Sequence, residues 1–316
     1  MTGSTAPVTL SVLDQSPITD HLDRTDALQE SLRLAERAER EGYRRIWYAE
    51  HHHSMSFASP APETMTALAL ERTTRIRVGT GGILLPLYTP QKVAETMGLL
   101  QQVHGDRVDI GIGRAALHTN DFPHKVETLL SRLPEGMPQT LTEPEHRVWV
   151  LGAGGTSAPL AANLGTGYVQ GHFLSPSSTP RGMRAYWDGV GKRPGFAVIA
   201  VRAVTADTAE KAQRLAAATA LWRARKDLNF DSAIPSLDRA ERDREWSDEE
   251  RARAVTREAG IIHGTPEDVR DQLLALAEQH RASEIMVNTL TSDPADRDAS
   301  YTLLAEAFDQ ATVGVA

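Results

Sequence analysis

Short apolar runs alternate along the chain with longer segments in which apolar residues recur at helical spacing. The apolar runs predict eight strands, over residues 8–13, 45–49, 76–85, 108–113, 148–151, 168–172, 196–204 and 284–289. The segments of helical spacing predict helices over residues 28–38, 62–72, 90–103, 121–133, 157–164, 181–187, 207–226, 265–280 and 295–311. Eight β/α repeats predict an α/β fold, a (β/α)8 TIM barrel that spans residues 1–316 as a single domain.

One segment, residues 227–262, interrupts this alternation after the seventh strand unit and is rich in both acidic and basic residues. Charge runs of this kind usually form a solvated helical insertion. A second interpretation is a lid that closes over the site and excludes water. The sequence leaves both interpretations open.

Bulk composition narrows the possible partners. With 41% hydrophobic and 24% charged residues, the chain of 316 residues has the composition of a globular protein with a large core. The net charge of -8 disfavours nucleic acid as a partner, and the absence of cysteine excludes disulfides and thiolate chemistry. We expect a cytoplasmic protein without a membrane segment, because neither a signal peptide nor an apolar run of roughly 20 residues is present.

The second predicted strand ends in three consecutive histidines that follow Glu50. In a barrel, reactive groups come from the carboxyl ends of the strands, which makes His51 a candidate hydrogen-bond donor or proton-transfer group. The alternative is a rim histidine that caps neighbouring carbonyls. No metal site is predicted, because successive strand residues point to opposite faces and cannot easily share one ion.

Two glycine-containing strand ends are further candidates. Gly81 and Gly82 lie within an apolar strand, where they indicate either a bulge or a backbone that supports a flat ligand ring, with a non-proline cis bond as one form of it. The loop over residues 152–157 follows a strand and opens a helix, so that its N–H groups can bind a phosphate. Arg114 can pair with the same phosphate. A tight structural turn and a surface salt bridge are the respective alternatives.

The chain resembles the bacterial luciferase-like family of flavin-dependent monooxygenases. The resemblance rests on elements that occur in order along nearly the whole chain: SVLDQSP at 11–17, WYAEHH at 47–52, VGTGGI at 78–83, GIGRA at 111–115, LGAGGTSA at 151–158 and GTPEDV at 264–269. It places His51 at the family's catalytic histidine beside the flavin ring. It also implies a set of cofactor-binding residues: Thr80, Gly81 and Gly82 at the non-proline cis peptide, and Arg114, Gly152, Ala153, Gly154, Gly155 and Ser157 around the phosphate.

The resemblance implies an enzyme that uses FMNH2 and O2. Reduced FMN would come from a separate NAD(P)H:flavin reductase, and a flavin C4a-hydroperoxide would insert one oxygen atom into a small molecule by epoxidation or hydroxylation. We expect a largely apolar substrate, possible examples being polyketide-type secondary metabolites of antibiotic biosynthesis. The alternatives are an oxidoreductase that depends on the deazaflavin F420 and a non-catalytic flavin-binding accessory subunit. A homodimer is expected, through the small residues of the helix over 62–72.

Two departures from the family pattern predict loose binding of FMN. The segment after Arg114 looks short, and Ala153-Gly154 stands where side-chain donors are frequent in relatives. We therefore expect the purified protein to retain little FMN, as measured by its absorbance in the flavin bands after FMN is added and the excess removed. Tight stoichiometric retention would contradict the prediction.

Overall fold

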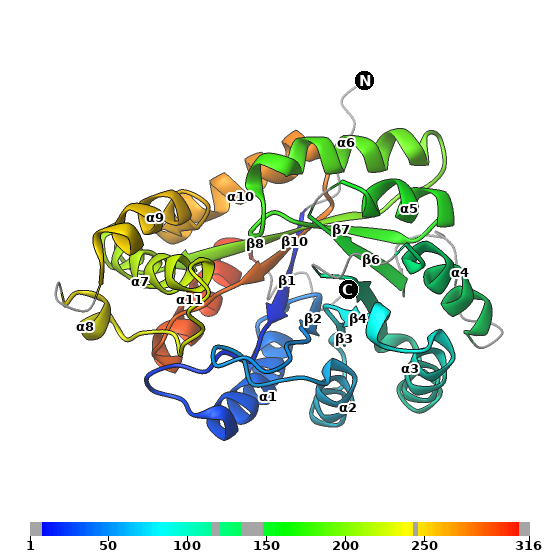
Figure 1. Ribbon diagram of the computed structural model, residues 1–316, viewed down its shortest axis with the longest axis horizontal. Helices are drawn as coiled ribbons and strands as arrows, with labels where there is room; N and C mark the ends of the chain where they lie inside the picture. Colours follow the sequence, from blue (N-terminus) through cyan, green and yellow to red (C-terminus); the bar gives the residue numbers. More distant parts are fainter. Residues whose placement is uncertain (1–7, 116–119, 134–147, 154, 243–245, 310–316) are drawn as a thin grey trace.

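Eight parallel strands close into a ring in the computed structural model, which describes residues 8–115, 120–133, 148–153, 155–242 and 246–309 (Figure 1). The ring runs β10-β1-β2-β3-β5-β6-β7-β8, and the pairing of β8 with β10 closes it. Its strands are β1 (Thr9–Asp14), β2 (Arg45–Tyr48), β3 (Arg77–Thr80), β5 (Val108–Gly113), β6 (Val148–Gly152), β7 (Gly167–Gly171), β8 (Ala197–Thr205) and β10 (Glu284–Asn288). The predicted (β/α)8 barrel is confirmed.

Helices surround the ring, as the spacing of apolar residues predicts (Figure 1). They are α1 (Arg24–Arg40), α2 (Pro62–Arg72), α3 (Pro90–His104), α4 (Phe122–Arg132), α5 (Ser157–Leu164), α6 (Thr179–Val190), α7 (Ala209–Asp227), α8 (Leu237–Ala240), α9 (Asp248–Glu258), α10 (Pro266–His280) and α11 (Pro294–Ala307). Short 3-10 turns lie at Leu85–Leu87, Gly105–Arg107 and Pro176–Ser178. None of the helices in the described ranges has the length and apolar character to cross a membrane.

The structure corrects the third predicted strand. Residues 76–85 do not form one continuous strand but two, β3 and β4 (Ile83–Leu84), and the Gly81-Gly82 peptide, which is cis, lies between them. Both pieces pair with β5. A short strand that the sequence did not predict, β9 (Ile262–Gly264), pairs with the end of β8.

The charged segment over 227–262 contains helices α8 and α9, and α9 packs along α7 (Figure 1). Arg225 of α7 forms an ion pair with Glu250 at 2.7 Å, and Asp227 pairs with Arg257 at 2.5 Å. Paired charges thus hold this insertion against the barrel helices, in agreement with its predicted helical character. Its role as a lid stays a prediction, as does self-association through α2.

Alternate residues of the strands point into the ring and fill it in layers. Arg45 lies at the amino end, 2.7 Å from Asp109 and 2.8 Å from Glu284. Above it, Trp47 and Trp149 meet edge to face with ring centroids 5.5 Å apart. These layers close the barrel from below, so that only the carboxyl ends of the strands are left to form a site.

Glycine makes room for the bulky middle layer. A Cβ atom at Gly167 would lie 2.3 Å from Cε3 of Trp149. We expect Gly167→Ala to lower the free energy of unfolding by about 1–3 kcal/mol, because the indole ring has to shift within a packed interior. Chemical denaturation measures the loss. The matched control is Gly113→Ala on β5, where the new atom would lie 3.8 Å from Leu151, an ordinary contact. Equal losses in the two variants would contradict the prediction.

Candidate active site

His51 follows β2 and lies at the mouth of the barrel. Its ring packs against Phe57 with centroids 4.2 Å apart, and its Nε2 atom lies 3.4 Å from Nε2 of Gln15. The Nδ1 atom of His51 and the Oε1 atom of Gln15 are buried and have no hydrogen-bond partner among the described residues. Buried polar atoms normally have partners. The ring therefore caps no carbonyl of the described chain, and two unmet hydrogen-bonding atoms lie in the mouth.

Burial, followed by the positive charge of Lys226, lowers the pKa of His51 to about 4. The imidazole is therefore neutral at neutral pH. A neutral ring has one donor and one acceptor nitrogen, so it can exchange a proton with a neighbour or hold one in place.

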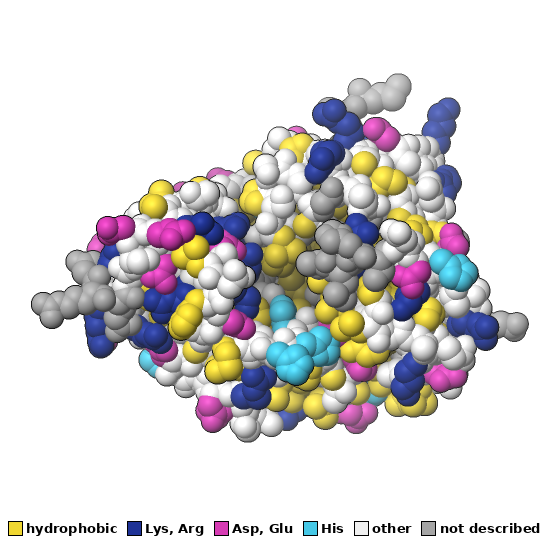
Figure 2. All heavy atoms as spheres, in the orientation of Figure 1, with side chains coloured by type: hydrophobic (Ala, Val, Ile, Leu, Met, Phe, Trp, Pro, Cys, Tyr) yellow, Lys and Arg dark blue, Asp and Glu magenta, His cyan; other side chains and the backbone are white. Residues whose placement is uncertain are grey.

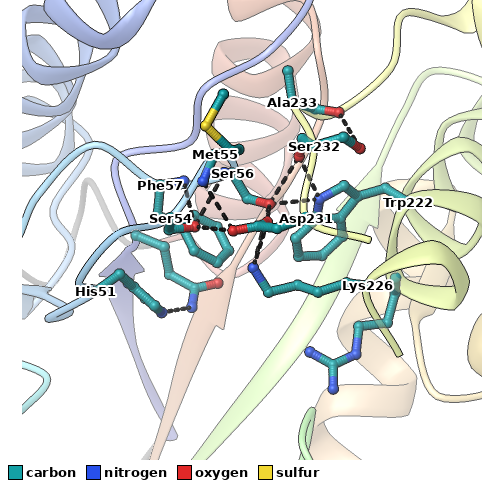
Figure 3. Close-up of polar contacts among 12 residues, drawn as sticks. His51, Ser54, Met55, Ser56, Phe57, Trp222, Lys226, Asp231, Ser232 and Ala233 are labelled. Atoms are coloured by element: carbon teal, nitrogen blue, oxygen red, sulfur yellow. Dashed lines mark hydrogen bonds and ion pairs between the residues drawn. The ribbon is translucent and has the colours of Figure 1, made fainter. Parts of the chain in front are cut away.

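A polar network fixes the segment that carries His51 against the end of α7 (Figure 3). Asp231 accepts hydrogen bonds from the Ser54 hydroxyl and from Nζ of Lys226, at 2.9 and 2.8 Å, and also from the Ser56 hydroxyl. Burial opposes ionisation of Asp231, but these hydrogen bonds outweigh it and lower the pKa of the carboxyl to about 2. Charged at neutral pH, Asp231 joins the histidine loop to the start of the charged insertion.

Glu50 and His52 contact each other, and Glu50 also contacts residues of β4 and the turn after it. The buried Glu50 carboxylate accepts a hydrogen bond from the backbone N–H of Leu84 and one from the Tyr88 hydroxyl, each at 2.8 Å, and also contacts His52. It thereby anchors β4 directly after the Gly81-Gly82 peptide. Within the described ranges, no group of three or more histidine, cysteine, aspartate or glutamate side chains is placed to hold a metal ion.

The expected cis peptide is present between Gly81 and Gly82. A Cβ atom at Gly81 would lie 2.7 Å from Cδ1 of Leu13, and one at Gly82 would lie 2.8 Å from the carbonyl oxygen of Gly111. Close packing therefore requires glycine at both positions. The Thr80 hydroxyl donates to the Gly111 carbonyl at 2.8 Å and accepts from its N–H at 3.0 Å, so only the main chain of Thr80 is left to meet a ligand there.

The predicted phosphate-binding residues come together at the ends of β5 and β6. Arg114 donates a hydrogen bond to the Thr156 hydroxyl and forms no ion pair within the described part of the chain. Gly155 has a φ of 94°, which favours glycine, and a Cβ atom there would lie 3.4 Å from Nε of Arg181. The loop thus lies between two arginines.

Three further residues of the loop belong to the described part of the chain. Gly152 packs so closely against Ser157 that a Cβ atom would lie 2.6 Å from Cβ of the serine. The Ala153 carbonyl accepts a hydrogen bond from the Ser178 hydroxyl, and Ser157 begins α5. Gly154 lies outside the described residues.

The mouth of the barrel is hollowed (Figure 2). The floor of the hollow is apolar, with histidines on one side and lysine and arginine side chains on another. The apolar side chains that fill the barrel below it are Leu13, Trp47, Ala49, Trp149, Val169, Val198, Ala200 and Met286, joined by Leu151, Phe173 and Phe196. Such a hollow suits a largely apolar ligand with a few polar groups.

The model of the luciferase-like monooxygenase family matches this chain over residues 8–135 and 119–283. The chain belongs to the luciferase-like monooxygenase family. A Bacillus subtilis (strain 168) protein named YceB is 35% identical over 328 residues, 95% of this chain and 99% of that protein. The N-acetyl-S-alkylcysteine monooxygenase of the same strain is 29% identical over 333 residues, 95% of this chain and 98% of that protein.

Solved structures agree with this assignment. The crystal structure of apo-MsnO8 is 33% identical to this chain, with a TM-score of 0.83, and covers 96% of this chain and 99% of its own. Two more distant structures show the shared fold alone. One is the FMN complex of the oxygenating constituent of 3,6-diketocamphane monooxygenase from Pseudomonas putida, which is 18% identical and covers 95% of this chain and 97% of its own. The other is an F420-dependent secondary alcohol dehydrogenase, which is 14% identical and covers 96% of this chain and 99% of its own. The TM-score is 0.67 for each.

Sequence reasoning missed several residues that shape the mouth in this luciferase-like monooxygenase. Gln15 lies in the SVLDQSP element at the end of a predicted strand, and this position could have identified it as a residue of the mouth. Arg181, Lys226 and Asp231 reach the site from helices and from the insertion, and no sequence signal links them to strand ends. Arg202 was visible as a cation within an otherwise apolar predicted strand.

The depressed pKa of His51 gives a prediction for the pH dependence. We expect the ring to titrate near pH 4 in the folded protein, with no step between pH 5.5 and 7.5, as followed by NMR of its ring protons. Because the unfolded-state pKa of about 6.5 is higher, the unfolded chain binds the proton more readily. The contribution of His51 to stability is therefore complete above about pH 6.5 and is lost as the pH falls towards 4.

The variant Lys226→Met removes one positive charge that acts on His51 and should raise the pKa of its ring. Lys211→Met is the matched control, because Lys211 lies near the other end of α7, where it pairs with Asp296. A wild-type midpoint near 6.5, or equal shifts in the two variants, would be incompatible with this account.

Proposed function

We propose that this protein is a flavin-dependent monooxygenase that receives reduced FMN from a separate NAD(P)H:flavin reductase and inserts one oxygen atom of O2 into a small, largely apolar molecule. The observation that carries the proposal is the arrangement at the barrel mouth. A neutral, half-buried His51 with a buried, unmet nitrogen lies on the same rim as the side-chain-free Gly81-Gly82 peptide and the loop between Arg114 and Arg181.

The residues of the mouth fit the parts of FMN. A phosphate would be held by the Arg114 guanidinium, the hydroxyl and amide groups of residues 155–157, and the positive end of α5. The flat ring would lie against the main chain at Gly81-Gly82, where no side chain projects. Reduced FMN supplies the two electrons with which one atom of O2 enters the substrate while the other becomes water.

His51 would hold or move a proton at the reacting oxygen. The neutral ring can donate through one nitrogen while the other faces the Gln15 amide. Because the His51 ring is neutral, it also places no positive charge beside the reacting oxygen. Closure of the mouth by α9 and the charged insertion would exclude water during this step, which is the role proposed for a lid.

Several observations favour oxygenation over the alternatives. One relative, 29% identical to this chain, is an N-acetyl-S-alkylcysteine monooxygenase, and a structure with bound FMN shares the barrel. Dependence on F420 is the second candidate, since an F420-dependent dehydrogenase has the same fold at 14% identity. A non-catalytic accessory role is disfavoured by the intact and buried surroundings of Glu50 and His51. Substrates to test include thioethers, after the named relative, and polyketide-type metabolites.

The test supplies reduced FMN or reduced F420 to the protein under 18O2 together with a substrate panel. We expect 18O in a product with reduced FMN only. His51→Gln should lower the yield of product per reduced flavin by about 10²-fold, because proton transfer at the reacting oxygen is lost. His53→Gln, at an exposed position two residues on, is the matched control and should match the wild type. O2-independent oxidation with F420, or full activity of His51→Gln, would overturn the proposal.

A further inference from the structure

Arg202 occupies an unusual position for a cation. It lies on β8, two and four residues after Ala200 and Val198, which both point into the barrel interior, and in register with Asn288 of β10. The side chain therefore reaches the barrel mouth on the inner face of the strand. Only 5% of Arg202 is exposed.

The contacts of this guanidinium are few for a buried charge. Two of its nitrogens donate to Oδ1 of Asn288, each at 3.3 Å, and the group lies between the rings of Phe173 and Trp222, 5.2 and 5.6 Å from their centroids. Within the described part of the chain, no carboxylate lies within 4.0 Å of it. The other deeply buried arginines differ, since Arg45 and Arg297 each have an aspartate at 2.7 Å.

The charged neighbours of Arg202 do not compensate it. A small cavity is lined by Arg202 together with Phe173, Arg223 and Arg257, among other residues. Asp227 is paired with both Arg223, at 2.9 Å, and Arg257, at 2.5 Å. Burial, helped by the charges of these two arginines, lowers the pKa of Arg202 to about 9. The guanidinium is still charged at neutral pH, so a cation without a counterion lies beside a cavity.

A buried charge without a partner is costly, and a ligand that supplies the missing anion removes that cost. We propose that Arg202 binds a carboxylate group of the substrate, whose apolar remainder lies over the floor of the mouth with its reacting atom towards His51. This inference rests on the proposed function and deepens it, because it narrows the substrate class to apolar molecules that carry a carboxylate. The planar fork of the guanidinium, which lies near two aromatic rings, matches a carboxylate in two parallel hydrogen bonds.

The geometry places the two ends of such a molecule on one rim. The amide nitrogen of Asn288 donates to the Leu13 carbonyl at 3.0 Å, and Gln15, two residues further on, faces His51. The side chains from Arg202 to His51 thus follow the mouth from β8 through β10 and β1 to β2. The phosphate-binding loop lies elsewhere, because β5 and β6 are separated from β8 by β7. Arg202 is therefore not part of the predicted phosphate site.

Binding to flavin-free protein tests the inference without any oxygenation. Calorimetry would compare octanoate and 4-phenylbutanoate with octanamide and 4-phenylbutanamide, which have the same apolar parts but no charge. We expect the carboxylates to bind at least about ten-fold more tightly to the wild type. Arg202→Gln should abolish this preference, and Arg202→Lys should keep part of it, because an ammonium retains the charge and loses the planar fork.

Arg193→Gln is the matched control, because Arg193 donates to the main-chain carbonyls of Val190 in α6 and Ala162 in α5, and the variant should leave the preference unchanged. Inorganic phosphate should not displace the carboxylates, and displacement would place them in the phosphate site and overturn the inference. The melting temperature of Arg202→Gln should equal or exceed that of the wild type, because an unpaired buried charge is removed.

Absence of a carboxylate preference in the wild type, or its persistence in Arg202→Gln, would refute the role of Arg202. Either result leaves the proposed function intact if reduced FMN still supports 18O incorporation into neutral substrates. If 18O incorporation fails but the carboxylate preference is present and depends on Arg202, the proposed oxygenation is refuted, and the carboxylate-binding role of Arg202 still holds.

Discussion

Arg45 is fully buried at the amino end of the barrel between Asp109 and Glu284, and the layers above depend on this ion cluster. Burial opposes ionisation of Asp109, but the charges of Arg45 and Arg77 outweigh it and hold the pKa of that carboxyl below its usual range. Loss of one partner from such a cluster typically costs about 3–5 kcal/mol, because the remaining charge stays buried and unpaired. The cluster fixes the strand register and closes the lower end, which leaves a single open end.

The same alternation of inward-facing residues builds the mouth from the upper ends of the strands. Tryptophans rest on the ion cluster, a layer of smaller apolar side chains follows, and Arg202, Asn288 and His51 lie beyond it towards the carboxyl ends of the strands. Arg202 and the Nδ1 atom of His51 are both buried in this last layer, without the partners that Arg45 has at the other end. At the amino end of the barrel, the buried charged groups have partners, and this end supports the fold. At the carboxyl end, buried polar groups lack partners, and this end is suited to bind a ligand.

The charged insertion connects this binding end to the outer helices. Asp231 holds the histidine loop through Ser54, Ser56 and Lys226, while Asp227 pairs with arginines on α7 and α9. One short segment therefore touches both the neighbourhood of His51 and the cavity beside Arg202. A displacement of the insertion would change the burial of both groups, and this links substrate entry to the electrostatics of the site.

The sequence by itself determined the eight β/α repeats, the placement of His51, Arg114 and the glycine loop at strand ends, and the special backbone at Gly81-Gly82. These features follow from local periodicity and from the chemistry of single residues, which need no knowledge of distant neighbours. Only the tertiary structure decided that His51 is neutral and that Arg202 lacks a carboxylate, because burial and pairing depend on residues far apart in the chain. Lys226 and Asn288 illustrate the reason. Lys226 lowers the pKa of His51, and Asn288 accepts hydrogen bonds from Arg202, and in each case the two residues are more than 80 positions apart in the chain.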